Sequence, residues 1–200
     1  MTQALVLGNG ESRKGLDLNQ LKTNHTIIGC NAIVRDFQVD YLVCCDKRMA
    51  DEANRLTNKP IYTRPEWMTA LNRVDIFNKL PNIPYFSTEK IDQPINWGSG
   101  PYAVLLAAEM GFPKIVLAGF DLYSKNDKIN NIYKGTEHYL PETAKPVDPA
   151  YWIHQIGQLM MVNPFVEFVV LNEEGWQLPE EWKRDNVRFQ TIADYGVDIK

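Results

Sequence analysis

Short, continuously apolar segments recur along the chain and are separated by longer stretches of mixed polarity. Strands that are buried on both faces of a parallel sheet are apolar throughout, whereas half-exposed strands alternate between apolar and polar residues. The pattern therefore predicts seven buried strands and a weaker eighth one. They are Ala4–Leu7, Thr26–Cys30, Tyr41–Cys45, Pro60–Tyr62, Ile83–Phe86, Lys114–Ala118, Glu167–Leu171 and the weaker Val187–Ile192.

The segments between these runs carry helical patterns. Helices are predicted at Leu16–Leu21, Lys47–Leu56, Glu66–Asn72, Pro101–Met110 and Asp148–Val162. Strands that alternate with helices form parallel sheets with helices on both faces. We therefore predict an α/β protein with a single Rossmann-like, three-layer α/β/α domain over residues 1–200 and a mainly parallel sheet.

Two segments stand out in this pattern. The stretch Pro101–Met110 is nearly all apolar inside, with Pro101 at a plausible first helical position and Gly111 as its C-cap, so it predicts a buried helix. Residues 123–149 are irregular and rich in Asn, Lys, Gly and Pro. A loop of this length in a compact domain is usually a lid or a binding loop, so we predict a lid-like loop here.

Composition narrows the class of protein. The 200 residues are 44% hydrophobic and 23% charged, with a net charge of −4, which argues against a nucleic-acid binder. No apolar stretch approaches the ~20 residues that span a bilayer, and no signal peptide precedes the first strand. Because Cys30, Cys44 and Cys45 lie in strand-like runs, we expect reduced thiols and a cytoplasmic protein. The five tryptophans fit core packing or a subunit interface, which leaves a homo-oligomer open.

Candidate ligand-binding residues follow the predicted strands, because ligands of this fold bind at the carboxyl ends of the strands. The turn Gly8-Asn9-Gly10 presents backbone N–H groups, as nucleotide phosphate sites do, or is only a tight connection. The third glycine of a dinucleotide fingerprint is missing. The residues that follow the other strands are Asn31, Asp46, Gly119 with Asp121, and Asn172.

A second glycine turn, Gly98-Ser99-Gly100-Pro101, opens the predicted buried helix. Ser99 is expected to be its N-cap or the neighbour of the N-cap. Alternatively, the helix N-terminus and its free N–H groups hold an anionic group. Together the two turns could hold a phosphate from two sides.

Several side chains could carry chemistry. Asp46 and Asp121 are suited to hold Mg²⁺ against a phosphate, or else to cap a helix and form a turn. The predicted loop contains tyrosines and a histidine, which donate hydrogen bonds or protons near a leaving phosphate, or which pack and pin the loop. These loop residues are Tyr123, Tyr133, His138 and Tyr139.

Four motifs in this chain resemble the bacterial sialyltransferases of glycosyltransferase family 42. They are Gly8-Asn9-Gly10-x-Ser12, Cys30-Asn31, Gly98-Ser99-Gly100 and the AGFDLY segment at 118–123. The most specific block is SGPYAVLLAAEMGFPKIVLAGFDLY, residues 99–123, and the resemblance covers roughly residues 4–140. The chain also resembles the related domain-of-unknown-function-115 group, which includes motility accessory proteins and 6-hydroxymethylpterin diphosphokinases.

The resemblance implies a Rossmann-like sheet that binds a cytidine-monophosphate sugar at its strand ends without a required metal. Tyr123 and Tyr133 would then stabilise the departing phosphate. Asn9 and Asn31 would contact the nucleotide or its phosphate, and Ser99 and Gly100 would hold donor groups at the helix start. The full predicted nucleotide-binding set is Gly8, Asn9, Gly10, Ser12, Asn31, Asp46, Ser99, Gly100, Gly119 and Asp121.

The chain departs from the family pattern at two positions. Glu142 stands where the sialyltransferases carry a histidine base, so Glu142 or His138 is the expected base. Asp46 stands where the sialyltransferases carry asparagine, and the run Val39–Asp46 looks more like the diphosphokinase and motility branch. Substrate identity is therefore not carried over from the family.

Three functions remain open from the sequence. The first is a small glycosyltransferase that transfers a sugar, such as a sialic-acid-like one, from a CMP-type donor to a glycan acceptor. The second is a Mg²⁺-dependent pyrophosphokinase that acts on a pterin-like alcohol, with Asp46 and Asp121 as metal ligands. The third is a non-catalytic nucleotide-binding protein on the same fold, which the missing family histidine favours.

Overall fold

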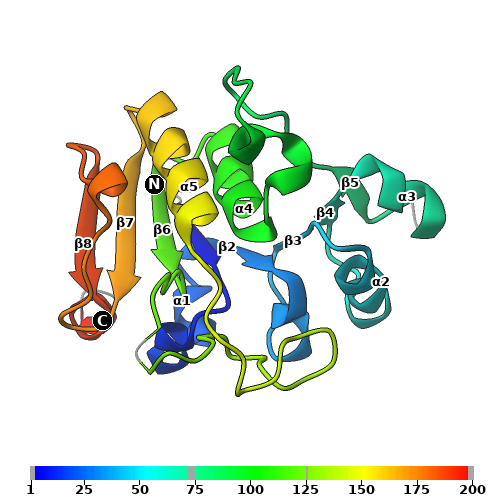
Figure 1. Ribbon diagram of the computed structural model, residues 1–200, viewed down its shortest axis with the longest axis horizontal. Coiled ribbons are helices and arrows are strands. Elements are labelled where there is room, and N and C mark those ends of the chain that lie inside the picture. Colours follow the sequence, from blue (N-terminus) through cyan, green and yellow to red (C-terminus); the bar gives the residue numbers. More distant parts are fainter. Residues whose placement is uncertain (1–2, 72–74, 125, 198–200) are drawn as a thin grey trace.

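The protein folds around one parallel sheet (Figure 1). The structure is a computed structural model that describes residues 3–71, 75–124 and 126–197. Within these ranges the sheet has the strand order β5-β4-β3-β2-β1-β6-β7-β8, and every neighbouring pair is parallel. The strands are β1 (Gln3–Leu7), β2 (His25–Cys30), β3 (Tyr41–Cys44), β4 (Ile61–Thr63), β5 (Phe77–Lys79), β6 (Lys114–Ala118), β7 (Glu167–Asn172) and β8 (Val187–Thr191).

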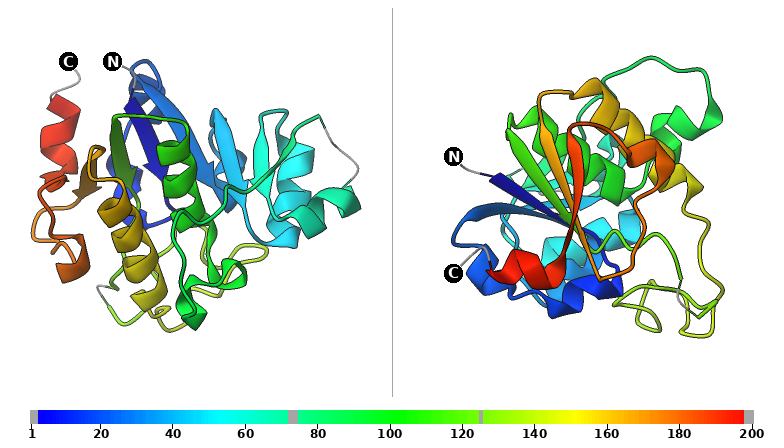
Figure 2. Two further views of the ribbon diagram at one scale, coloured as in Figure 1. Left: turned by 90° about the horizontal axis from the view of Figure 1, so that it is seen from above. Right: turned by 90° about the vertical axis from the view of Figure 1, so that its left-hand side faces the viewer.

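Helices cover both faces of this sheet, as the pattern of alternating strands and helices predicts. The α-helices are α1 (Leu18–Leu21), α2 (Lys47–Leu56), α3 (Pro65–Leu71), α4 (Ser99–Glu109), α5 (Ala150–Val162) and α6 (Ile192–Val197). The 3₁₀ helices are η1 (Glu11–Gly15), η2 (Asn31–Arg35), η3 (Lys90–Asp92), η4 (Pro94–Asn96) and η5 (Glu180–Trp182). Figure 2 shows α4 and α5 on one side of the sheet and α1 and α6 on the other.

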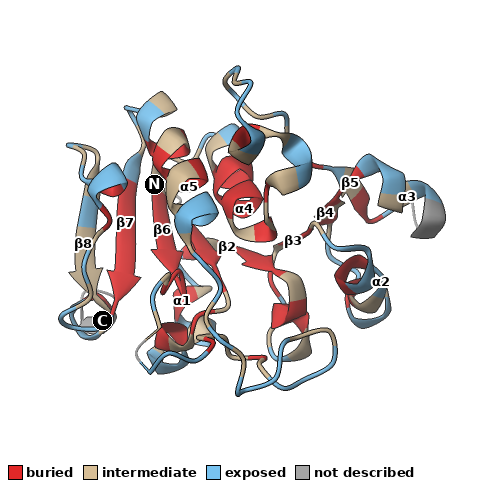
Figure 3. Cartoon of the chain, in the orientation of Figure 1, coloured by how far each residue is buried: buried red, intermediate tan, exposed pale blue. Residues whose placement is uncertain are grey.

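The strands carry two cores, one on each face. On β1, Ala4 and Val6 pack with α4 and α5, whereas Leu5 and Leu7 pack with η2, α2 and the C-terminal helix. All four side chains are fully buried, and the central strands are buried along their length (Figure 3). Coverage of both faces is the reason why these strands are apolar throughout. The predicted α/β/α architecture is confirmed.

The order of the strands reverses next to β1. The chain proceeds from β1 through β2, β3 and β4 to β5, and then crosses back to place β6 on the other side of β1. Such a switch point opens a crevice at the carboxyl ends of the two central strands, where ligands of doubly wound sheets bind. The segment 123–149 runs past these carboxyl ends, at the bottom of Figure 1.

The predicted strand Ile83–Phe86 is wrong. The edge strand is β5, and residues 83–86 are irregular, with the Phe86 side chain 92% exposed. Pro84 lies inside the predicted segment and has no N–H to donate, which disfavours pairing there.

Four predicted helices differ at their ends. The helices predicted over Leu16–Leu21 and Asp148–Val162 begin two residues later, as α1 at Leu18 and α5 at Ala150. The helix predicted to begin at Pro101 begins at Ser99, so the proline is the third helical residue. The helix predicted over Glu66–Asn72 is α3, which begins at Pro65, and Asn72 lies outside the described residues.

The composition also led to predictions about the cysteines, the tryptophans and membrane-spanning segments. All three cysteines are free thiols, and burial raises the pKa of both Cys30 and Cys44. Trp97 and Trp182 are buried in the core on the side of α4 and α5. None of the helices in the described part of the chain combines the length and apolarity that crossing a bilayer requires.

Candidate functional site

A cavity of about 780 Å³ opens at the switch point. It is bounded by the turns that follow the central strands, by the start of α4 and by parts of the loop 123–149. The structure therefore brings together most of the residues that the sequence singles out. Those in the lining are Gly8, Asn9, Gly10, Asn31, Asp46, Ser99, Gly100, Gly119, Asp121 and His138.

The turns after β1 and β6 are joined by hydrogen bonds to one another. The Gly8 amide donates to the Ala118 carbonyl at 2.9 Å, and the Gly10 amide donates to the Gly119 carbonyl at 2.8 Å. A Cβ atom at Gly8 would lie 2.4 Å from the Gly119 carbonyl oxygen, so only glycine fits there. Of the two alternatives for this turn, these hydrogen bonds favour the tight connection. Close approach of the two turns accounts for the glycines.

Ser12 and Asp121 add hydrogen bonds between the segment that follows β1 and the segment that follows β6. The Asp121 carboxylate accepts from the Ser12 amide at 2.9 Å and from the Ser12 hydroxyl. Both side chains are buried, and Ser12 is not among the residues that line the cavity. A Cβ at Gly10 would collide with the Asp121 carboxyl group at 2.4 Å. These contacts give Ser12 and Asp121 a structural role in the turn.

The start of α4 differs from these turns in its hydrogen bonding. Ser99 Oγ donates to Asn31 Oδ1 at 2.8 Å and accepts from the Cys45 amide at 2.9 Å. One side chain thereby ties the ends of β2 and β3 to the helix and holds Asn31 in a left-handed conformation with φ 52°. Gly98 is the N-cap and provides no side-chain cap. The helix N-terminus, with its partial positive charge, therefore faces the cavity without a capping side chain.

Arg64 adds a buried positive charge beside the cavity. Its guanidinium donates to four backbone carbonyls, at distances of 2.9 to 3.1 Å, and the residue is 8% exposed. Lys47 and Arg48 also line the cavity. Asp46 caps α2 through the Arg48 amide at 2.8 Å, and although burial opposes it, hydrogen bonds from Arg48 lower the pKa of this carboxyl. The three cationic side chains of the lining outnumber its two carboxylates, Asp46 and Asp121, and Arg48 is paired with Asp46 at 3.3 Å, so the excess of positive charge is small.

Asp46 and Asp121 both line the cavity, but they are too far apart to share one metal ion. They follow β3 and β6, which are three strand spacings apart in the sheet, or roughly 14 Å. Two carboxylates that share one Mg²⁺ each lie about 2.1 Å from it. Among the described residues, no group of three or more His, Cys, Asp or Glu side chains is arranged to hold a metal ion.

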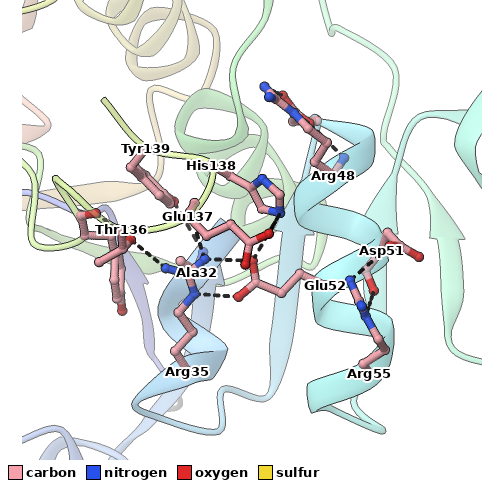
Figure 4. A network of polar contacts seen from close by, with 12 residues as sticks. Ala32, Arg35, Arg48, Asp51, Glu52, Arg55, Thr136, Glu137, His138 and Tyr139 are labelled. Atoms are coloured by element: carbon pink, nitrogen blue, oxygen red, sulfur yellow. Dashed lines mark hydrogen bonds and ion pairs between the residues drawn. The ribbon is translucent and has the colours of Figure 1, made fainter. Parts of the chain in front are cut away.

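His138 lines the cavity from the loop, and a charged network lies behind it (Figure 4). Its Nε2 is 3.9 Å from the Glu52 carboxylate on α2. Arg35 donates two hydrogen bonds to Glu52, one of them at 2.7 Å from Nη2, and also binds Thr136 Oγ1 at 2.7 Å and the Glu137 carbonyl at 3.0 Å. The hydrogen bonds from Arg35 lower the pKa of Glu52. The network fixes the loop to η2 and α2.

Tyr139, a loop candidate to which the family resemblance assigns no role, reaches the cavity, whereas Tyr133 does not line it. The Tyr139 hydroxyl accepts from the Asn9 side-chain amide at 3.3 Å. The Tyr133 hydroxyl donates to Asp36 at 2.7 Å and accepts from Arg13 at 2.9 Å. Tyr133 is 4% exposed, and burial raises its pKa to about 12. Through these two hydrogen bonds, Tyr133 fixes the loop to Arg13 and Asp36.

The other two predicted catalytic residues also lie outside the lining of this cavity. Glu142 is exposed, and its side chain packs against Gly135 in the loop. Tyr123 is 41% exposed and lines a neighbouring cavity beside Trp176. Of the four residues predicted to be catalytic, His138 is the one that the structure places in the first cavity.

Comparisons with known proteins bear on this site through the fold. No protein-family model and no curated protein matches the chain. The chain is similar to a crystal structure of the sialyltransferase CST-II in complex with a trisaccharide acceptor and CMP. The TM-score is 0.58 at 15% identity, over 84% of this chain and 80% of that chain. It is also similar to CstII from Campylobacter jejuni in complex with the substrate analogue cytidine-5'-monophosphate. There the TM-score is 0.56 at 14% identity, over 85% of this chain and 79% of that chain.

These likenesses show a fold shared with glycosyltransferases of known structure. The predicted resemblance to sialyltransferases is confirmed at the level of the fold. The resemblance to the domain-of-unknown-function-115 group stays a prediction.

Proposed function

We propose that this protein is a glycosyltransferase that transfers a sugar from a CMP-type nucleotide donor to a glycan acceptor. One observation carries the proposal. The α4 N-terminus, which no side chain of the described residues caps, opens into a cavity at the switch point of the sheet. In addition, the structures that share this fold include complexes with CMP. A helix N-terminus of this kind binds the phosphate of a nucleotide.

The residues around the cavity have distinct roles under this proposal. The amides of Ser99 and Gly100 at the helix start hold the phosphate. The buried guanidinium of Arg64 and the ammonium of Lys47 favour its negative charge. Asn9 and Asn31 lie at the ends of β1 and β2, where they are available to the ribose and the base. Because positive charge comes from the protein, we propose that donor binding needs no divalent metal.

His138 is the proposed base. The acceptor hydroxyl oxygen attacks the anomeric carbon of the donor sugar, the bond from that carbon to the phosphate oxygen breaks, and CMP leaves. The Glu52 carboxylate lies on the Nε2 side of the imidazole, so Nδ1 is the nitrogen that takes the proton of the acceptor hydroxyl. The network of Arg35 and Glu52 holds the ring in place for this step.

A thermal-shift panel with CMP, CDP, UDP, GDP and ATP, each with Mg²⁺ and with EDTA, tests the proposal. A ligand at 100 times its dissociation constant adds about 2.7 kcal/mol of stability, which is several degrees for a domain of this size. We expect CMP to stabilise the protein equally in Mg²⁺ and in EDTA. Stabilisation that requires Mg²⁺ and a triphosphate, or no stabilisation by any nucleotide, would overturn the proposal.

A further inference from the structure

A second cavity, of about 500 Å³, lies beside the first at the carboxyl end of β7. The two cavities share part of their walls, at Asp121, Ser124, Ile129 and Asn130. The proposed transfer reaction uses the first cavity for the donor and for His138. The chemistry of the second cavity is different from that of the first, and three observations define what it binds.

The first observation is a partly exposed aromatic side chain in the lining of the second cavity. Tyr123 is 41% exposed, and its ring lies 6.2 Å from the ring of Trp176, at an angle of 37°. Trp176 is fixed in turn, because its Nε1 donates to the Asp121 carbonyl at 2.8 Å. The face of an aromatic ring carries negative charge density, which attracts the weakly positive C–H groups on one side of a sugar ring. A tyrosine held in this way is suited to stack on a saccharide.

The second observation is an unsatisfied buried donor. Asn172 ends β7, lines the second cavity and is only 3% exposed. Its Oδ1 accepts from the Glu173 amide at 2.8 Å, which fixes the orientation of the side chain. Its Nδ2 has no hydrogen-bond partner within the described part of the chain. An amide donor that is buried without an acceptor is costly, so a ligand oxygen at this position is favourable.

The third observation is the charge of the lining. The carboxylates of Glu11, Asp121, Glu173 and Glu174 outnumber the ammonium groups of Lys128 and Lys134. Lys134 is itself paired with Glu11 at 3.2 Å. A phosphate or a sugar acid would be repelled here, whereas neutral hydroxyl groups can donate to carboxylates and accept from the amide of Asn172.

The geometry points to the second cavity as a binding site for a neutral saccharide unit, stacked on Tyr123 and hydrogen-bonded to Asn172. If the proposed glycosyltransferase function holds, this unit belongs to the acceptor, and the shared wall connects its site to the cavity that His138 lines. Tyr123 is then a residue of acceptor recognition, in place of the role at the leaving phosphate that the sequence predicts.

The test separates saccharide binding from nucleotide binding. Saturation-transfer NMR on the full chain, with lactose, maltose and cellobiose as neutral probes, measures the first, and calorimetry with CMP measures the second. In Tyr123→Ala we expect about tenfold weaker saccharide binding and unchanged CMP binding. The matched control is Tyr151→Ala, which removes a tyrosine of similar exposure, 38%, from α5. In the described part of the chain Tyr151 lines neither cavity, so we expect no change.

Each outcome is decisive. Loss of saccharide binding in Tyr123→Ala alone supports the inference, even where CMP does not bind and the proposed function has failed. Loss of CMP binding in Tyr123→Ala would overturn it, because the second cavity would then be part of the nucleotide site. Absence of a saccharide signal in the wild-type protein, or equal loss in both variants, would overturn it as well.

Discussion

The two glycine turns of this chain look alike in sequence and differ in the structure. In Gly8-Asn9-Gly10 the first glycine amide donates to the last residue of β6 and the second to the turn after β6, and no side chain would fit at Gly8. In Gly98-Ser99-Gly100 the chain starts a helix whose N-cap has no side-chain cap, although both turns line the cavity. We call the first the closed side of the site and the second, together with His138, the open side.

The difference shows what a Gly-x-Gly sequence encodes. Glycine permits either the close approach of two backbones or the exposure of backbone amides to a ligand, and the spacing of the glycines is the same in both cases. Which of the two applies depends on the neighbouring strand. β6 lies beside β1 and accepts from the amides of its turn, whereas the start of α4 faces the cavity. We therefore expect substitutions on the closed side to change stability and substitutions on the open side to change activity or CMP binding.

The largest expected effect is on the open side, at His138. If His138 takes the acceptor proton, His138→Ala lowers kcat for sugar transfer by about 10²–10⁴-fold while CMP binding is unchanged. The matched control is Glu142→Ala in the same loop, because Glu142 is exposed and lies outside the lining of the cavity. Steady-state kinetics with a CMP-linked sugar measure both variants. A large loss in Glu142→Ala with full activity in His138→Ala would reverse the assignment of the base.

The next effect is on stability and belongs to the closed side. In Gly8→Ala the new Cβ lies 2.4 Å from the Gly119 carbonyl oxygen, so the turns of β1 and β6 must separate. We expect a loss of about 3 kcal/mol in the free energy of unfolding. In Gly15→Ala the nearest atom is Ile192 Cγ2 at 3.7 Å, and the expected change is within about 0.5 kcal/mol. Denaturation with urea compares the two, and equal losses would contradict the closed turn.

The sequence predicts the central part of the fold better than its edge, for a physical reason. β1, β2 and β6 are buried on both faces, so their apolar runs are unbroken. β5 consists of three residues, Phe77-Asn78-Lys79, of which only Phe77 is buried. This edge strand pairs on one side and carries no apolar run, whereas the nearby Ile83–Phe86 segment is more apolar without being a strand.

For the site, the rule that ligands bind at strand ends finds the turns after β1, β2, β3 and β6. It also applies to Arg64, the residue after β4, which the predicted strand Pro60–Tyr62 does not place at a strand end. The roles of the loop tyrosines are harder to predict. The contacts of Tyr133 with Arg13 and Asp36 join segments about a hundred residues apart, and local sequence does not encode which tyrosine makes them.

A matched pair of serines sharpens the comparison further. Ser99→Ala removes the hydroxyl that pairs with Asn31 and with the Cys45 amide, and we expect a loss of about 2 kcal/mol of stability. Because the helix start also holds the proposed phosphate, CMP binding is expected to weaken in this variant. Ser12→Ala removes a hydrogen bond to Asp121 on the closed side, so stability falls while CMP affinity is unchanged. Calorimetry with CMP measures both, and equal affinity in the two variants would contradict an open α4 start.

The smallest expected effect concerns the charged network that holds the loop over the open side. Hydrogen bonds from Arg35 lower the pKa of Glu52 from its usual value of 4.5. A carboxyl whose pKa is lower in the folded state contributes stability that is fully present above pH 4.5 and is lost as the pH falls through the lowered value. In Glu52→Gln this contribution is absent at every pH. The free energy of unfolding of the variant should therefore fall less than that of the wild type between pH 5 and pH 3, as urea titrations at each pH measure.

The control is Glu142→Gln, which replaces an exposed carboxyl in the loop and should follow the wild type. If the Glu52 and Glu142 variants lose stability in parallel, the ion pair with Arg35 does not hold the loop.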